Sequence, residues 1–119
     1  MSETDPNLGL TYAWPLGTTP WNTDNDANLK KIGAILGLSV TEIGTETPPV
    51  GPSNGDRYVF GATPSGAWAG EGGNVAVYIE SAWEFYTPAT GWLAYNESDT
   101  NLYLFNGVAW KVYAMQIGI

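Results

Sequence analysis

The chain has 119 residues, enough for one domain or for a small domain with an arm, and only 13% of them are charged. Its net charge of −8 argues against binding to nucleic acid or insertion at an anionic membrane surface, because both partners require a basic face. The chain has no cysteine and no histidine, which excludes disulfides and removes the commonest general base and metal ligand.

Residues 1–22 are predicted to form an extended arm, because prolines and glycines interrupt the segment and no helical period is present. Large apolar side chains alternate with other residues along this arm, and they are candidate assembly contacts: Leu8, Leu10, Tyr12, Trp14 and Leu16. Such a stripe requires burial but does not identify what covers it. Two interpretations stay open: the arm packs on its own domain, or it docks on a neighbouring subunit.

Residues 23–54 are predicted to contain one short helix and a linker. Apolar residues recur with the helical period over 23–37, Asp24 and Asp26 suit the positive start of a helix, and Gly37 is a stop signal. The two aspartates also have the opening spacing of a calcium loop. The glycine and glutamate that such a loop needs are missing, so we predict no metal site. Residues 38–43 are predicted to form a short strand, and a proline- and glycine-rich linker follows.

Residues 55–119 are predicted to form an antiparallel β domain with two repeated hairpins. The segment 74–86 aligns without gaps on 101–113, and each copy has the pattern of a strand, a tight turn and a second strand. Asn106-Gly107 predicts a two-residue turn in the second copy. The predicted strands are 57–60, 74–79, 83–86, 92–95, 102–105 and 108–113.

The predicted fold class is therefore mainly β. We expect a small antiparallel sheet or barrel-like module of short strands and hairpins, preceded by an extended arm and one short helix. Short strands separated by closely spaced turn signals are typical of such modules.

Both faces of the second hairpin carry large apolar side chains. Leu102 and Leu104 lie on one face of the strand, and Tyr103 and Phe105 lie on the other. A half-solvated sheet would instead alternate apolar with polar residues. Both faces therefore need cover, and one short helix cannot supply all of it. We expect oligomerisation or ligand contact, with Tyr103 and Phe105 as candidate assembly contacts.

The sequence predicts no catalytic residue and no cofactor. The carboxylates near predicted turns could in principle supply the acid and base of a glycosidase, but a solvated surface explains them well. No serine or threonine has a histidine partner, and no nucleotide-binding motif occurs. Trp68 and Trp92 lie beside glycine or alanine in predicted turns, where an exposed ring could stack on a sugar. They are candidate glycan or partner contacts; the alternative is that both are core or interface residues.

Four segments resemble a domain of unknown function found in tailed-phage and prophage proteins. They are GDRYVFGATPSGAWAG at 55–70, VAVYIESAWEF, TPATGWLAY at 87–95 and LYLFNGVAWKV, and the resemblance covers about residues 8–113. It implies a structural virion protein of the tail, a fibre or baseplate component that mediates assembly or host attachment and carries no catalytic residues. Such a protein is made in the host cytoplasm and ends in the virion tail.

The resemblance also implies partners. Fibre proteins are usually threefold, so we expect a homotrimer in contact with other tail or baseplate proteins. The alternative function is a carbohydrate-binding module that recognises a receptor, with a host surface glycan as its ligand.

Overall fold

A computed structural model describes residues 2–19 and 21–113 of the chain. Its contacts define two compact units, an N-terminal unit of Met1–Leu36 and a β unit of Gly37–Ile119. The sequence predicts boundaries after residues 22 and 54. The chain is instead divided once, after Leu36, because the helix contacts the segment that precedes it.

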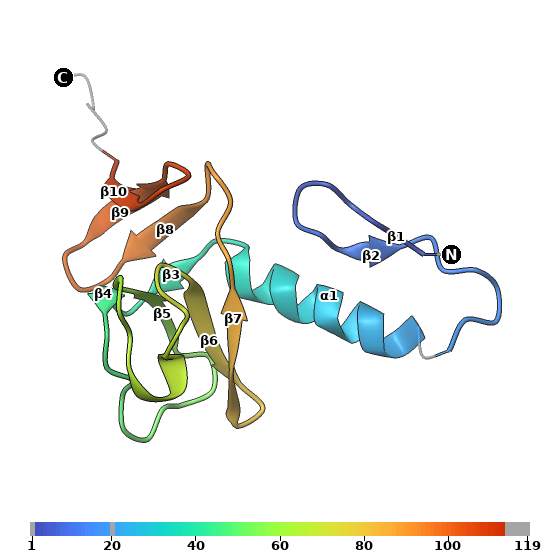
Figure 1. The fold of residues 1–119 in the computed structure, drawn as a ribbon, viewed down its shortest axis with the longest axis horizontal. Helices are drawn as coiled ribbons and strands as arrows, with labels where there is room; N and C mark the ends of the chain where they lie inside the picture. Colours follow the sequence, from blue (N-terminus) through green and yellow to red (C-terminus); the bar gives the residue numbers. More distant parts are fainter. Residues whose placement is uncertain (1, 20, 114–119) are drawn as a thin grey trace. The chain divides into compact units, whose positions relative to one another are not determined.

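The N-terminal unit is a hairpin that lies along a helix (Figure 1). Its elements are β1 (Glu3–Thr4), β2 (Thr11–Tyr12) and α1 (Trp21–Ile35). Where the sequence predicts an extended arm, residues 3–12 thus form two paired strands. The turn between them is held by the Asp5 carboxylate, which accepts hydrogen bonds from the backbone N–H groups of Asn7, Leu8 and Leu10. The predicted helix is present and begins two residues earlier than expected.

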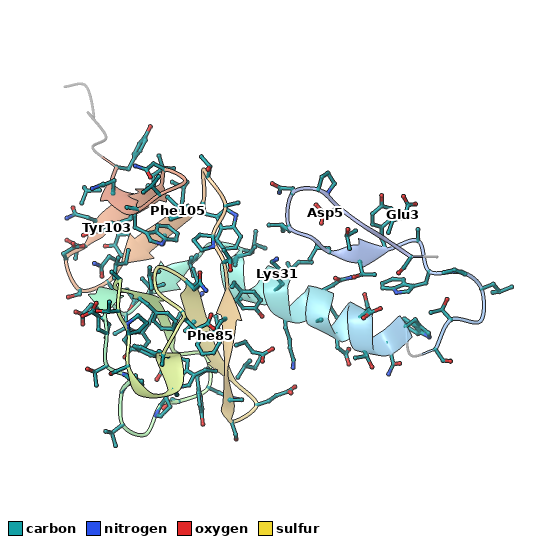
Figure 2. All side chains as sticks on the ribbon, in the orientation of Figure 1. Glu3, Asp5, Lys31, Phe85, Tyr103 and Phe105 are labelled. Atoms are coloured by element: carbon teal, nitrogen blue, oxygen red, sulfur yellow. The ribbon has the colours of Figure 1, made fainter. Side chains whose placement is uncertain are left out.

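Polar side chains of α1 attach the hairpin to the helix. The side-chain oxygen of Asn28 accepts the Thr11 N–H at 2.9 Å, and its amide nitrogen donates to the Thr11 carbonyl at 2.7 Å. The Lys31 ammonium donates to the Leu8 carbonyl. Figure 2 shows Lys31 on α1 and Asp5 in the hairpin turn. These contacts pair backbone groups of Thr11 in β2 and of Leu8 in the turn with side chains of the helix.

The β unit consists of two four-stranded sheets (Figure 1). One sheet has the strand order β10-β9-β8-β3 and the other the order β4-β5-β6-β7. Within the described residues of this unit, the strands and the 3-10 turn are β3 (Ser39–Val40), β4 (Ile43–Thr45), β5 (Arg57–Phe60), η1 (Gly66–Trp68), β6 (Val75–Ile79), β7 (Ala82–Tyr86), β8 (Leu93–Asn96), β9 (Asn101–Phe105) and β10 (Trp110–Val112). The mainly β prediction is confirmed; in the described residues the sheets stay open and form no closed barrel.

The segment that the sequence predicts as one strand over 38–43 is divided between the two sheets. Its first part, β3, pairs in parallel with β8, and β4 pairs in parallel with β5. Between them, the Thr41 N–H donates to the Arg57 carbonyl and the Glu42 carbonyl accepts from Val59. Both sheets are therefore mixed, because one short segment borders each of them.

The two repeated hairpins have their turns at equivalent positions. In the first, Ile79 pairs with Ala82, and both loop residues, Glu80 and Ser81, have positive φ (54° and 63°). This is the conformation that a type I′ turn requires, here adopted without glycine.

The second turn is shifted by one residue from the predicted Asn106-Gly107 pair. The Asn106 N–H donates to the Ala109 carbonyl, and the Asn106 side-chain oxygen accepts from the N–H groups of Val108 and Ala109. Gly107 has φ of 98°, as expected, whereas Asn106 does not have positive φ. The Asn106 side chain accepts hydrogen bonds that a backbone carbonyl would otherwise accept. Asn106 therefore pairs with Ala109 and flanks the loop instead of lying in it.

Two apolar clusters stabilise the β unit. The first joins the two sheets and consists of the buried residues Leu38, Val40, Val59, Val75 and Ala94. The second lies on the other face of β5, β6 and β7, where Phe60, Trp68 and Ala76 are buried. The sheet β4-β5-β6-β7 therefore has apolar cover on both faces, as its sequence requires.

Candidate functional site: an exposed apolar sheet face

The sheet β10-β9-β8-β3 has one face turned away from the core, which we call the outer face. On it, Leu93 lies opposite Leu104 and Tyr95 lies opposite Leu102. Leu93 is 48% exposed and Tyr95 is 40% exposed, while the two β9 leucines are half-buried. Four large apolar side chains at paired cross-strand positions form a patch of the kind that marks an interaction surface.

The inner face of the same sheet explains why the outer residues cannot turn inward. Ala94 is fully buried in the cluster that joins the sheets, and Asn96 is buried with 4% exposure. Strand residues alternate between faces, so burial of positions 94 and 96 places positions 93 and 95 on the outer face. A one-residue slip would bury Tyr95 and expose Ala94, which the packing opposes.

Tyr103 and Phe105, the sequence's assembly candidates on β9, lie on the inner face. Tyr103 pairs with Ala94, and the Phe105 ring lies 5.3 Å from that of Trp110, whose indole N–H donates to the Gly73 carbonyl. Figure 2 shows both candidates on β9. They contribute to packing within the chain, and the half-buried leucines of the same strand lie on the outer face.

The turn after β8 fixes Tyr103 further. Its hydroxyl donates to the Asp99 carboxylate at 2.5 Å. This hydrogen bond lowers the pKa of Asp99, assisted by the backbone N–H of Asn101 and opposed by desolvation. The same bond raises the pKa of Tyr103, with desolvation acting in the same direction. Asp99 is therefore a carboxylate at neutral pH, and it accepts the Tyr103 hydrogen bond within the β8–β9 turn.

Opposite charges stand at opposite edges of the outer face. Lys111 on the edge strand β10 lies beside Leu104, and it is exposed. Glu97 follows β8 at the other edge, where its N–H donates to Val40 and its carboxylate accepts from the Ser39 hydroxyl at 2.6 Å. The face is therefore apolar in its centre and carries a cation on one side and an anion on the other.

Neither tryptophan candidate has the fully exposed ring that stacking on a sugar would use. Trp68 is fully buried, with its ring 4.4 Å from Phe60 and 5.1 Å from Trp83, so it is a core residue and its faces cannot stack on a sugar. Trp92 is half-buried and packs against the cluster that joins the sheets. Of the two interpretations drawn from the sequence, the core interpretation fits Trp68.

The five apolar candidates of the N-terminal segment are only partly covered. Leu8, Leu10 and Trp14 are half-buried, and the Trp14 ring lies 6.3 Å from that of Trp21. Tyr12 is 47% exposed and Leu16 fully exposed. The hairpin therefore covers part of its apolar stripe on α1 and leaves the rest exposed.

The described residues offer binding surfaces more readily than chemistry. Within residues 2–19 and 21–113 no group of three or more acidic, histidine or cysteine side chains is arranged to hold a metal ion. No helix in this part of the chain combines the length and apolar character that a membrane crossing requires. The outer face can bind an apolar surface with charged flanks.

None of the four apolar residues of the outer face is among the candidate contacts predicted from the sequence. The sequence marks β9 as apolar on both sides but does not decide which side faces the core. The signal that could have decided this is the pair of small or polar residues in β8, Ala94 and Asn96, between Leu93 and Tyr95. An alternation of large and small residues indicates which side is packed closely.

The residues of the outer face lie within the part of the chain that matches a known protein family. Residues 25–111 match the family DUF2793, described as a protein of unknown function, and the chain belongs to this family. No curated protein gives a significant match. The match includes both charged edges of the outer face, Glu97 and Lys111, and leaves out the N-terminal hairpin.

Proposed function

We propose that the chain is a structural virion protein of a tailed phage, a tail fibre or baseplate component that acts by assembly and not by catalysis. The observation that carries this proposal is the outer face, where Leu93, Tyr95, Leu102 and Leu104 form an apolar patch on a fully folded sheet. A monomer gains nothing by exposing such a patch, whereas a subunit buries it against its neighbour. The resemblance of its motifs to phage and prophage proteins supports the setting.

The N-terminal unit supports assembly independently. It spans only Met1–Leu36, and Ala34 is the one buried apolar residue among its described positions. Units below about 40 residues usually need disulfides, a metal or association to stay folded. This chain has no cysteine, and its described residues hold no metal-binding group. The hairpin and helix therefore depend on support from outside themselves, which subunits of an assembly provide.

We further propose a homotrimer that contacts other tail or baseplate proteins and takes part in host attachment. Closed cyclic symmetry covers the outer face of every copy at once, and threefold symmetry agrees with the fibre-like setting. The virion tail is then the site of the protein, after its synthesis in the host cytoplasm.

Antibody labelling of purified virions tests this function. An antibody raised against the purified chain should decorate tails in electron micrographs, and deletion of the coding sequence should give particles with incomplete tails. Particles with intact tails and unchanged infectivity after the deletion would contradict the proposal.

A glycan array separates this function from the carbohydrate-binding alternative. Trp92 is the tryptophan candidate with a partly accessible ring. We expect no sugar binding that Trp92→Ala abolishes. Millimolar or tighter binding that this substitution removes would favour the receptor-recognition module.

A further inference from the structure

We propose that the outer face of the β10-β9-β8-β3 sheet is a head-to-tail interface between copies of this chain, in which Lys111 of one copy pairs with Glu97 of the next. The inference rests on the self-assembly put forward above and names the surface, the partner and the charged contact. It commits to a second copy as the occupant because the face is complementary to itself.

The positions of the two charges exclude a pair within one chain. The Lys111 strand and the Glu97 strand are separated by β9, and Glu97 stands four residues beyond Leu93, the residue in line with Lys111. Strand geometry puts them roughly 10 Å apart across the sheet and roughly 13 Å apart along it. Each charge therefore needs a partner from another molecule if the apolar centre between them is covered.

Charge complementarity selects the same chain as that partner. Covering the outer face brings Lys111 and Glu97 toward a dry interface, where an unpaired charge is costly. A partner must therefore offer an anion on one side and a cation on the other, with apolar residues between them. The outer face itself has this pattern. The cation is the scarcer group, because the chain has only four basic side chains.

Charges at opposite edges can pair face to face across a twofold axis or edge to edge in a closed ring, and the trimer proposed above selects the ring. In a cyclic assembly one edge of each subunit meets the opposite edge of the next subunit, so the same contact repeats around the axis. Here the β10 edge of each copy, with Lys111, meets the β3 edge of its neighbour, where the Ser39 hydroxyl holds the Glu97 carboxylate in place. The central leucines and Tyr95 then point toward the axis and cover one another.

A different role for Lys111 is to block unwanted pairing of an exposed edge strand, a common use of lysine. That role needs a charge of either sign on β10, whereas the interface needs a positive charge. Lys111→Glu separates them: an edge blocker stays soluble and keeps the oligomeric state, and an interface residue loses it.

The test is a charge swap followed by sedimentation velocity and equilibrium on the full-length chain. Lys111→Glu and Glu97→Lys should each raise the dissociation constant of the assembly about ten-fold or more, because each sets like charges together. The double variant Lys111→Glu, Glu97→Lys should bring it back to within about three-fold of the wild type, since the pair is restored in reverse. Circular dichroism confirms that each variant is folded.

Two further variants serve as matched controls. Glu97→Gln keeps a hydrogen bond to Ser39 without the charge and should give an intermediate loss. Glu42→Lys makes the same change in net charge at an exposed position whose backbone belongs to the other sheet, and it should leave the assembly unchanged. Without any substitution, raising the salt concentration from about 0.05 M to about 0.5 M should weaken the wild-type assembly.

The outcomes distinguish this proposal from the proposed function. An oligomer that all single reversals leave intact overturns the Lys111–Glu97 contact, while virion labelling can still support the structural role. Loss of assembly in the double variant, equal to that in the single variants, also overturns the pairing. If the swap is restored but antibody labelling places the chain outside the tail, the interface stands and the proposed function fails.

Discussion

The two units of this chain are stabilised in different ways. The β unit has two buried apolar clusters, one between its sheets and one on the opposite face of β5, β6 and β7. Val40 in the first and Trp68 in the second are fully buried. The N-terminal unit is held by polar side chains that bind backbone groups, notably Asp5 and Asn28. Apolar burial supplies most of the stability of a folded domain, whereas each hydrogen bond adds about 1 kcal/mol net.

The β unit thus has an apolar core of its own, whereas the N-terminal unit has only one buried apolar residue, Ala34, among its described positions. The outer face of the β unit lies outside the buried clusters that hold its two sheets together. The N-terminal unit has a defined shape with little core, so small local changes should open it while leaving the β unit folded.

Trp68→Ala should have the largest effect. It removes a fully buried ring that contacts Phe60, Tyr58 and Trp83, and truncations of this kind cost about 3–5 kcal/mol. Chemical denaturation of the whole chain, followed by fluorescence, measures the loss. Trp68→Phe is the matched control, because the indole N–H makes no hydrogen bond to the described residues, and it should cost less. Equal midpoints for Trp68→Ala and the wild type would show that this cluster does not stabilise the β unit.

Gly107→Val should come next. Gly107 has φ of 98°, and a Cβ there would lie 2.7 Å from the Thr90 hydroxyl oxygen. Strain of this kind costs about 1–3 kcal/mol, so the thermal midpoint should fall. Val108→Ala, in the same turn at an 89% exposed residue, should leave the midpoint unchanged. A melting curve for Gly107→Val that matches the wild type contradicts the turn described here.

Asn28→Ala should open the hairpin and spare the β unit. It removes both hydrogen bonds to Thr11, at an expected cost of about 1 kcal/mol in the stability of the N-terminal unit. Amide hydrogen exchange should become faster at Thr11 and remain unchanged in β5 and β6. Asn22→Ala, an exposed asparagine on the same helix, is the control. Faster exchange throughout the chain would mean that the two units are not independent in stability.

Acid should have the smallest effect, and a local one. The backbone N–H groups of Leu8 and Leu10 lower the pKa of Asp5 below its usual 3.8. A lowered folded pKa contributes stability above the unfolded pKa that is lost as the pH falls through the folded value. The turn at Asp5 should therefore loosen only below about pH 4, seen as shifted amide resonances of Leu8 and Leu10. Asp5→Asn should remove this pH response; a response that persists would assign it to another group.

The sequence predicts the positions of most strands of the β unit, but it does not predict which distant segments pair. Residues 57–60 were predicted as a strand with the bounds that β5 has, because alternation and turn signals are local. The parallel pairing of Ser39 with Tyr95 joins residues far apart in the chain, and no local pattern encodes it. The division of 38–43 between two sheets was missed for the same reason.

Side chains that replace backbone acceptors account for the other differences. Asp5 closes a hairpin in a segment predicted to be extended, and Asn106 shifts the loop of the second hairpin by one residue. Both residues favour turns, but their types alone do not say which backbone groups they bind. For the candidate site, the sequence predicted that both faces of β9 need cover, and the exposed face could be chosen only once Ala94 and Asn96 were placed in the core.

Sedimentation equilibrium of the full-length chain at micromolar concentration tests the central claim most directly. An assembling subunit should give a mass that is a whole-number multiple of the 12.8 kDa of one chain, and the trimer proposed here gives three times that mass. A single species at 12.8 kDa over the whole concentration range, with the outer face still exposed to chemical labelling at Lys111, would contradict it.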